Sequence, residues 1–148
     1  PWERRYRVAI NITSDYALRT ILYLSNEAGR EKISGKEICD EMTIPYNYFL
    51  KIVPLLKDAG FLSSFQGKKG GYTLLKSPEE ISVYDILVAM SDPIIVSHCL
   101  LDNSICSRRA AGHCTMHALF GTIQTYIDQE MKRATMAEVL KNGLPVSF

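Results

Sequence analysis

The spacing of apolar residues changes abruptly at Gly60. Over residues 46–59, apolar residues recur at the three- and four-residue intervals of a helix with one buried face. After Gly60, two short apolar runs at 61–65 and 72–75 flank the sequence Gln-Gly-Lys-Lys-Gly-Gly, which is typical of a tight, basic hairpin tip. A helix followed directly by such a hairpin predicts a mainly α-helical fold that carries one small β-hairpin.

Capping residues locate the other helices. Ser14 or Asp15 is expected to begin a first helix that ends near residue 25. Ser34, followed three residues later by Glu37, indicates a capping box at the start of a short second helix. Pro54 lies inside the third helix and predicts a bend there. The remaining expected helices cover residues 83–90 after the cap Ser82, then 114–133 and 136–141.

A short helix, a turn at 43–45, a longer helix and a basic hairpin form, in that order, the pattern of a winged helix-turn-helix. The second helix of this unit enters the major groove, where asparagine can pair with adenine and lysine can reach guanine or phosphate. Lysines in the wing suit phosphates or a narrow minor groove. A solvated helix face beside an ordinary hairpin is the alternative, because lysine–glycine tips are common. The predicted contacts with double-stranded DNA are Ser34, Tyr46, Asn47, Tyr48, Lys51, Gln66, Lys68 and Lys69.

Composition permits a folded core but does not identify a function. The chain has 148 residues, 47% of them hydrophobic, and a net charge of only +1, so DNA binding would depend on local placement of charge. No apolar run is long enough to span a bilayer, and residues 1–8 lack the apolar centre of a secretory signal, so a cytoplasmic location away from membranes is expected. No Ser-His-Asp set, phosphate-binding loop or paired carboxylate arrangement indicates an enzyme.

Three of the four cysteines, together with one histidine, follow the spacing C-x6-C-x7-C-x2-H. Thiolates and histidine ligate iron–sulfur clusters, and Cys114 and His117 would share one face at the start of a helix. Zinc is the main alternative, although zinc sites usually contain closer cysteine pairs, and a redox-active thiol is another. Cys39 is expected to be a small buried hydrophobe. The predicted metal ligands are Cys99, Cys106, Cys114 and His117.

The chain resembles the Rrf2 family of small winged-helix repressors, typified by IscR, NsrR and CymR. The resemblance extends over about residues 10–140. It depends on the three cysteines and on four runs: Ser14-Asp15-Tyr16-Ala17-Leu18-Arg19, Leu56-Lys57-Asp58-Ala59-Gly60-Phe61-Leu62, Gly67-Lys68-Lys69-Gly70-Gly71-Tyr72-Thr73-Leu74 and Ile81-Ser82-Val83-Tyr84-Asp85-Ile86-Leu87.

The resemblance implies a homodimer that reads a pseudo-palindromic operator and senses iron–sulfur, nitric oxide, iron or redox status. The run from Cys114 to Phe120 is similar to the IscR version, which favours [2Fe–2S] over [4Fe–4S], with an apo form without the cluster. Asp15 matches the place where NsrR-like proteins supply an aspartate ligand from the partner subunit, so it is the alternative fourth ligand. Two departures are longer cysteine spacings and Gln66 where the family usually has arginine. CymR-like members lack a cluster, so a clusterless regulator controlled by a protein partner is the alternative function.

These observations divide the chain into expected functional units. An apolar face on the long helix, too apolar for a lone exposed helix, predicts a two-fold dimer. The residues of this face are Leu119, Ile123, Tyr126, Ile127 and Glu130. The expected units are an N-terminal extension (1–9), a winged helix-turn-helix domain (10–90), a cluster-binding loop (91–113), and a dimerisation helix with a C-terminal tail (114–148).

Overall fold

Helix α1 (Ile12–Asn26) contacts most of the other elements. They are α2 (Gly35–Met42), α3 (Tyr46–Asp58), β2 (Gly71–Leu74), α4 (Val83–Ala89) and α6 (Met136–Lys141). The computed structural model describes residues 10–142. Asn11 caps α1, because its side-chain oxygen accepts a hydrogen bond of 2.9 Å from the backbone N–H of Ser14. The prediction that Ser14 or Asp15 is the cap is therefore wrong. Earlier initiation places the Ser14 side chain on the buried face, where it is fully covered.

Helices α2 (Gly35–Met42) and α3 (Tyr46–Asp58) form the helix-turn-helix. Ser34 caps α2 as predicted, accepting a bond of 3.1 Å from the backbone N–H of Glu37. The reciprocal bond of a capping box is not made within the described chain, because the Glu37 carboxylate is held by Tyr23 and Arg30 instead. Helix α3 continues through Pro54.

The wing is an antiparallel pair of strands, β1 (Leu62–Phe65) and β2 (Gly71–Leu74), with Leu62 opposite Leu74 and Phe65 opposite Gly71. Two glycines with positive φ make the necessary reversals of direction: Gly60 (75°) ends α3 and Gly67 (102°) lies in the wing tip. The predicted hairpin is thus confirmed, with each strand within a residue of its expected place.

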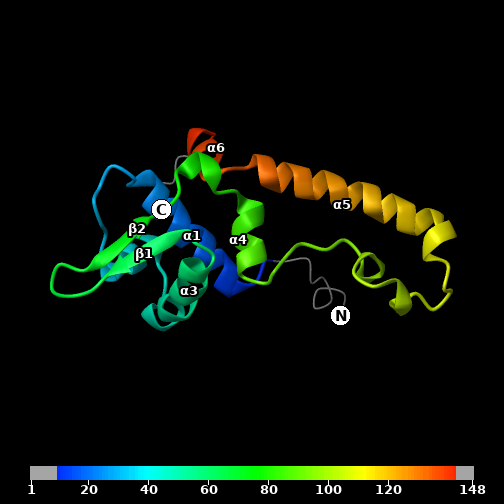
Figure 1. Ribbon diagram of the computed structural model, residues 1–148, viewed down its shortest axis with the longest axis horizontal. Helices are drawn as coiled ribbons and strands as arrows, with labels where there is room; N and C mark the ends of the chain where they lie inside the picture. The colour runs from blue at the N-terminus through cyan, green and yellow to red at the C-terminus, as the bar shows by residue number, and fades with distance from the viewer. Residues whose placement is uncertain (1–9, 143–148) are drawn as a thin grey trace.

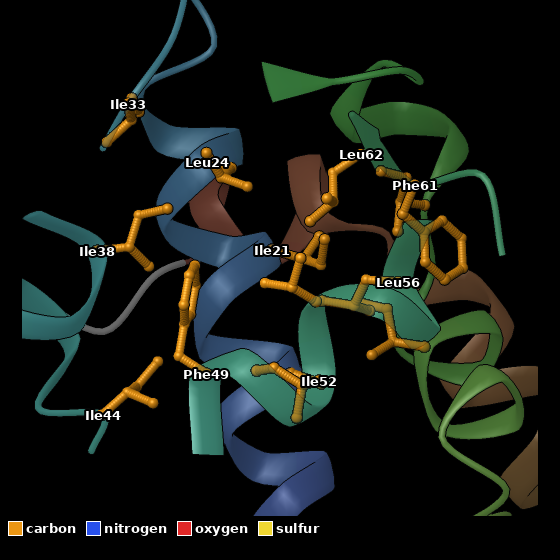
Figure 2. Close-up of a cluster of buried hydrophobic side chains, with 14 of the residues drawn as sticks. Ile21, Leu24, Ile33, Ile38, Ile44, Phe49, Ile52, Leu56, Phe61 and Leu62 are labelled. Atoms are coloured by element: carbon orange, nitrogen blue, oxygen red, sulfur yellow. The ribbon is translucent and has the colours of Figure 1, made fainter. Parts of the chain in front are cut away.

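The core lies where α1, α3 and the base of the wing meet (Figure 2). Phe49 and Ile52 of α3 face Ile21 of α1, and all three side chains are fully buried. Leu62 contributes to the same cluster from β1, so the wing is attached to the helices by apolar packing as well as by the backbone.

After the wing, the chain passes through the short turn η2 (Pro78–Glu80) and enters α4 (Val83–Ala89). Ser82 and Asp85 form a complete capping box there. The chain then leaves through an extended segment with three single-turn elements, and returns along α5. These elements are η3 (His98–Leu100), η4 (Asn103–Ile105), η5 (Ala111–His113), α5 (Thr115–Arg133) and α6 (Met136–Lys141).

Figure 1 shows two parts of different shape: a head, residues 10–90 and 134–142, and an arm, residues 91–133, that projects from it. The arm returns where the Val83 N–H donates to Ala134 (3.0 Å) and the Met136 N–H donates to Ile81 (2.8 Å). Helix α6 then packs on α1. The expected extension (1–9) and the end of the expected tail (143–148) lie outside the described residues. Across 10–142, no helix combines the length and apolarity needed to cross a bilayer.

Candidate nucleic-acid interface and cysteine loop

The outer face of α3 carries the polar residues that the sequence predicts for base contact. Asn47 and Lys51 are exposed, and they lie one turn apart on the side opposite the buried stripe of the helix. Tyr46 is 54% exposed and stacks on Phe49, with ring centroids 6.1 Å apart. This helix face is therefore open to a ligand, and the opposite face of α3 is packed in the core.

Tyr48 differs from its neighbours because its ring is half-buried. It meets Tyr16 of α1 edge to face, with centroids 5.3 Å apart, and Lys51 Nζ lies 5.2 Å from the centre of the Tyr48 ring. Tyr48 therefore contributes to the contact between α1 and α3, and its ring also lies under the Lys51 ammonium group.

The predicted wing contacts Gln66, Lys68 and Lys69 are exposed at the hairpin tip. Strand β2 is tied to the segment before α2 through Ile33, whose backbone makes two hydrogen bonds with Tyr72 of 2.7 and 2.9 Å. A Cβ on Gly71 would lie 2.7 Å from the Ile33 carbonyl oxygen, so only glycine permits this approach. Ser34, the predicted contact at the start of α2, follows directly and is exposed.

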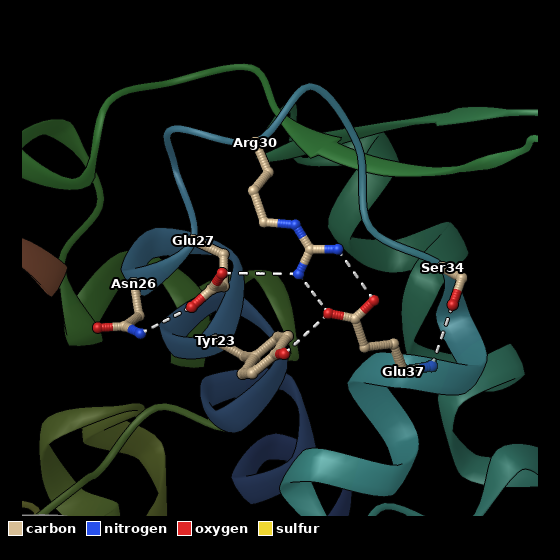
Figure 3. Close-up of polar contacts among 6 residues, drawn as sticks. All are labelled: Tyr23, Asn26, Glu27, Arg30, Ser34 and Glu37. Carbon is tan, nitrogen blue, oxygen red and sulfur yellow. Dashed lines mark hydrogen bonds and ion pairs between the residues drawn. The ribbon is translucent and has the colours of Figure 1, made fainter.

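A polar cluster joins the end of α1 to the start of α2 (Figure 3). The Tyr23 hydroxyl donates to Glu37 (3.0 Å), and Arg30 binds both Glu37 carboxylate oxygens while lying 3.6 Å from Glu27. Arg30 holds the pKa of the Glu37 carboxyl below its usual value, while burial and the neighbouring Glu37 raise the pKa of Tyr23 to about 12. The charged network thus orients the helix that carries Ser34.

The four predicted metal ligands occupy one end of the arm but do not converge. Among residues 10–142, no group of three or more His, Cys, Asp or Glu side chains lies close enough together to hold a metal ion. Cys99, Cys106 and Cys114 are free and partly exposed. Cys99 Sγ lies 3.3 Å from Ser97 Oγ. Ligation by all four residues would require the loop to close.

Two of the four donors, Cys106 and His117, have features that suit a metal ligand. Hydrogen bonds from the backbone at Ala110 and Arg108 lower the pKa of the Cys106 thiol, which favours the thiolate. Cys114 is the N-cap residue of α5, and His117 lies one turn further on. Within the described chain, His117 Nδ1 is buried without a hydrogen-bond partner. Buried polar atoms are nearly always satisfied, so this nitrogen lacks an expected contact.

Asp15 and Cys39 lie in the head. Asp15 forms an ion pair of 2.6 Å with Arg19 one turn along α1, so the carboxylate already has a partner. Cys39 is buried in the core, as predicted, and burial raises the pKa of its thiol.

Gln124 ties the start of the cysteine loop, residues 91–113, to α5. Its side-chain amide nitrogen donates to the Ile94 carbonyl oxygen and its oxygen accepts from the Val96 N–H, each at 2.8 Å. Its nitrogen also donates to Asp128 (2.8 Å). Sequence reasoning missed Gln124, since one glutamine on a helix gives no signal. It also missed Leu50, an exposed apolar residue beside Asn47 that the helical repeat of α3 could have revealed.

Together, the helix-turn-helix, the exposed polar face of α3 and the basic wing define a winged-helix DNA-binding protein. The Rrf2 family, described as an iron-dependent transcriptional regulator, matches residues 10–142. The chain therefore belongs to the Rrf2 family of transcriptional regulators, which bind DNA and are not enzymes.

Individual relatives agree with this assignment. The regulator NsrR of Bacillus licheniformis is 25% identical over 137 residues, which cover 87% of this chain and 90% of that protein. CymR, the global cysteine regulator of B. subtilis, has a similar structure, with a TM-score of 0.77 at 20% identity over 92% of this chain and 98% of that one. The structure of T. potens IscR gives a TM-score of 0.72 at 20% identity, covering 95% and 91% of the two chains. These two structures confirm the fold.

Proposed function

We propose that this chain is a dimeric transcriptional repressor whose DNA affinity is controlled by an iron–sulfur cluster, with [2Fe–2S] favoured over [4Fe–4S]. The observation that carries the proposal is the buried, unpartnered Nδ1 of His117, one turn from Cys114 at the start of α5. Cys99, Cys106 and Cys114 would supply thiolates, and His117 the fourth ligand. Asp15 is the second choice because it would have to leave Arg19. When bound, the cluster would supply an iron- and redox-sensitive link between the loop and α5.

Anaerobic reconstitution with iron and sulfide tests the ligand set. We expect broad visible absorption bands in the parent protein and in Asp15→Ala, weaker or shifted bands in His117→Ala, and no bands in Cys106→Ala. Cys39→Ala is the matched control, since Cys39 is buried in the head. Full cluster occupancy in Cys106→Ala would refute this site, and a colourless protein with stoichiometric zinc would assign a structural metal instead.

The proposed DNA interface consists of Ser34, Tyr46, Asn47, Tyr48, Lys51, Gln66, Lys68 and Lys69. Replacing both Lys68 and Lys69 by alanine should weaken binding to all sequences and reduce the slope of log affinity against log salt by about 2, because two phosphate contacts are lost. Asn47→Ala should instead relax preference at one base position. Lys141→Ala on α6 is the control for charge. Unchanged binding in a shift assay after all of the interface changes would show that the surface is misassigned.

The arm supports the proposal of a dimer. In the described chain none of the 19 residues of α5 is buried. Large apolar side chains are among the exposed ones: on the outer side of the helix, Leu119 is 49% exposed and Tyr126 is 67% exposed. Pairing of the faces formed by Leu119, Ile123, Tyr126, Ile127 and Glu130 would cover this apolar surface and set two reading helices about 34 Å apart. Ile123→Asp should therefore give monomers in light scattering, whereas Thr125→Asp, on the opposite side of α5, should not. A parent protein that is monomeric at micromolar concentration would contradict the proposal.

Among the described residues, Cys99, Cys106 and Cys114 do not come together into a metal-binding group, and this favours one further candidate function. This is a regulator of the same fold that holds no cluster and responds to a protein partner. Reconstituted protein that remains colourless and metal-free but binds its operator with full affinity would support this candidate over the first.

A further inference from the structure

Leu50 is a large apolar side chain on the outer side of α3, and it is 52% exposed. An exposed leucine is common on protein surfaces and is not by itself informative. The position of Leu50 is what distinguishes it. The residue lies three positions after Asn47 and four after Tyr46, so all three side chains share one patch of the helix surface.

The surroundings of Leu50 indicate which kind of ligand would cover it. Asn47 lies one turn before Leu50 and Lys51 is the next residue along the helix. Both are exposed, and their side chains carry the hydrogen-bonding groups that suit base edges and phosphates. The core on the other side of the helix is complete without Leu50, because Phe49, Ile52, Val53 and Leu56 form the buried stripe. Leu50 is therefore not needed for packing within the head.

The major groove offers a specific apolar partner to such a side chain. The C5-methyl group of thymine projects into the groove, and apolar side chains recognise thymine through it. We propose that Leu50 is a specificity-determining residue that packs against a thymine methyl group in the operator. The inference depends on the proposed function, in which α3 enters the major groove.

The helix geometry also restricts where this thymine lies. Three residues of α-helix rise about 4.5 Å along the helix axis, whereas successive bases along a strand are about 3.4 Å apart. The thymine that Leu50 contacts should therefore lie within one or two base pairs of the adenine that Asn47 reads. An A·T-containing step at this spacing is the expected signature in each half-site.

Replacing thymine by deoxyuridine removes only the methyl group and tests the contact directly. The parent protein would first select its preferred duplex from a random library. Each thymine of that duplex would then be replaced singly by deoxyuridine. We expect one replacement near the Asn47 site to weaken binding about fourfold for each reading helix, since one buried methyl group is worth about 0.8 kcal/mol. The same replacement should leave the affinity of Leu50→Ala unchanged.

Two further variants separate the possible outcomes. Leu50→Met retains an apolar contact and should keep the deoxyuridine penalty, while Asn47→Ala should lose preference for its adenine but also keep the penalty. A full penalty in Leu50→Ala, or no penalty at any thymine near the Asn47 site, would overturn the assignment of Leu50. If Asn47→Ala and Lys51→Ala also leave affinity and base preference unchanged, it is the proposed reading helix that fails. Circular dichroism checks that each variant is folded.

Discussion

The head and the arm contain similar apolar side chains but bury them to different extents. In the head, Phe49 and Ile21 are fully buried within a core shared by helices and wing. In the arm, Leu119 and Ile123 of α5 are 49% and 39% exposed, and the described part of that helix has no buried residue. Apolar periodicity therefore predicts which face of a helix is apolar, but not whether the same chain buries that face. The apolar side chains of the head are thus covered within the chain, whereas those on the outer face of α5 are not.

Removing one large side chain from each part should give the largest difference. Phe49→Ala leaves a cavity under the reading helix and should lower the free energy of unfolding by about 3–5 kcal/mol. Leu119→Ala, at an exposed site, should change it by less than about 0.5 kcal/mol at protein concentrations too low for dimers. Urea unfolding followed by circular dichroism measures both. Equal losses would mean that the arm contributes to the same core.

A smaller effect is expected from adding a methyl group within the head. A Cβ on Gly35 would lie 2.8 Å from Phe49 Cε1 and 3.1 Å from Tyr72 Cε2, so Gly35→Ala should destabilise by about 1–3 kcal/mol despite the higher helix propensity of alanine. Gly29→Ala has no atom within 4 Å of its new Cβ and should change stability by under about 0.5 kcal/mol. If Gly35→Ala is as stable as the parent in urea unfolding, the packing between α2 and the wing is looser than described.

The smallest effect concerns how the loop is attached to the arm. Gln124→Met removes the hydrogen bonds to Ile94 and Val96. Exchange of the Val96 amide hydrogen should accelerate about fivefold, since one hydrogen bond is worth about 1 kcal/mol. Amides of α1 should be unaffected, and Gln129→Met on the exposed side of α5 serves as the control. Equal acceleration in the head would show that the two parts open together.

The sequence predicted the head well because its signals are local. Ser34 and Ser82 cap the helices they were expected to cap, and the glycine-rich wing lies between the expected strands. Asn11 was missed because several polar residues near the start of α1 can cap a helix, and only packing of Ser14 selects between them.

The arm was predictable as an element but not as a site. Residues 115–133 form the expected long helix, since its apolar repeat and its boundaries are local. Whether the cysteines come together is not determined by local sequence signals. It depends on the path of the loop between Cys99 and Cys114, where no repeat or cap fixes the backbone, and the spacing alone therefore indicated chemistry but not geometry.

The arm leaves the head from one end of α4 and returns at the other, where Ile81 and Val83 bond to the backbone at Met136 and Ala134. Both ends of the arm are thus attached to helix α4, one at each end of the helix. The distance between the attachment points is set by seven helical residues and is independent of how many residues the loop contains. Insertions between the cysteines should therefore change the shape of the far end while leaving the join unaltered, at a cost that grows slowly with length. The head and the cysteine loop can consequently evolve at different rates, because their attachment at α4 stays the same.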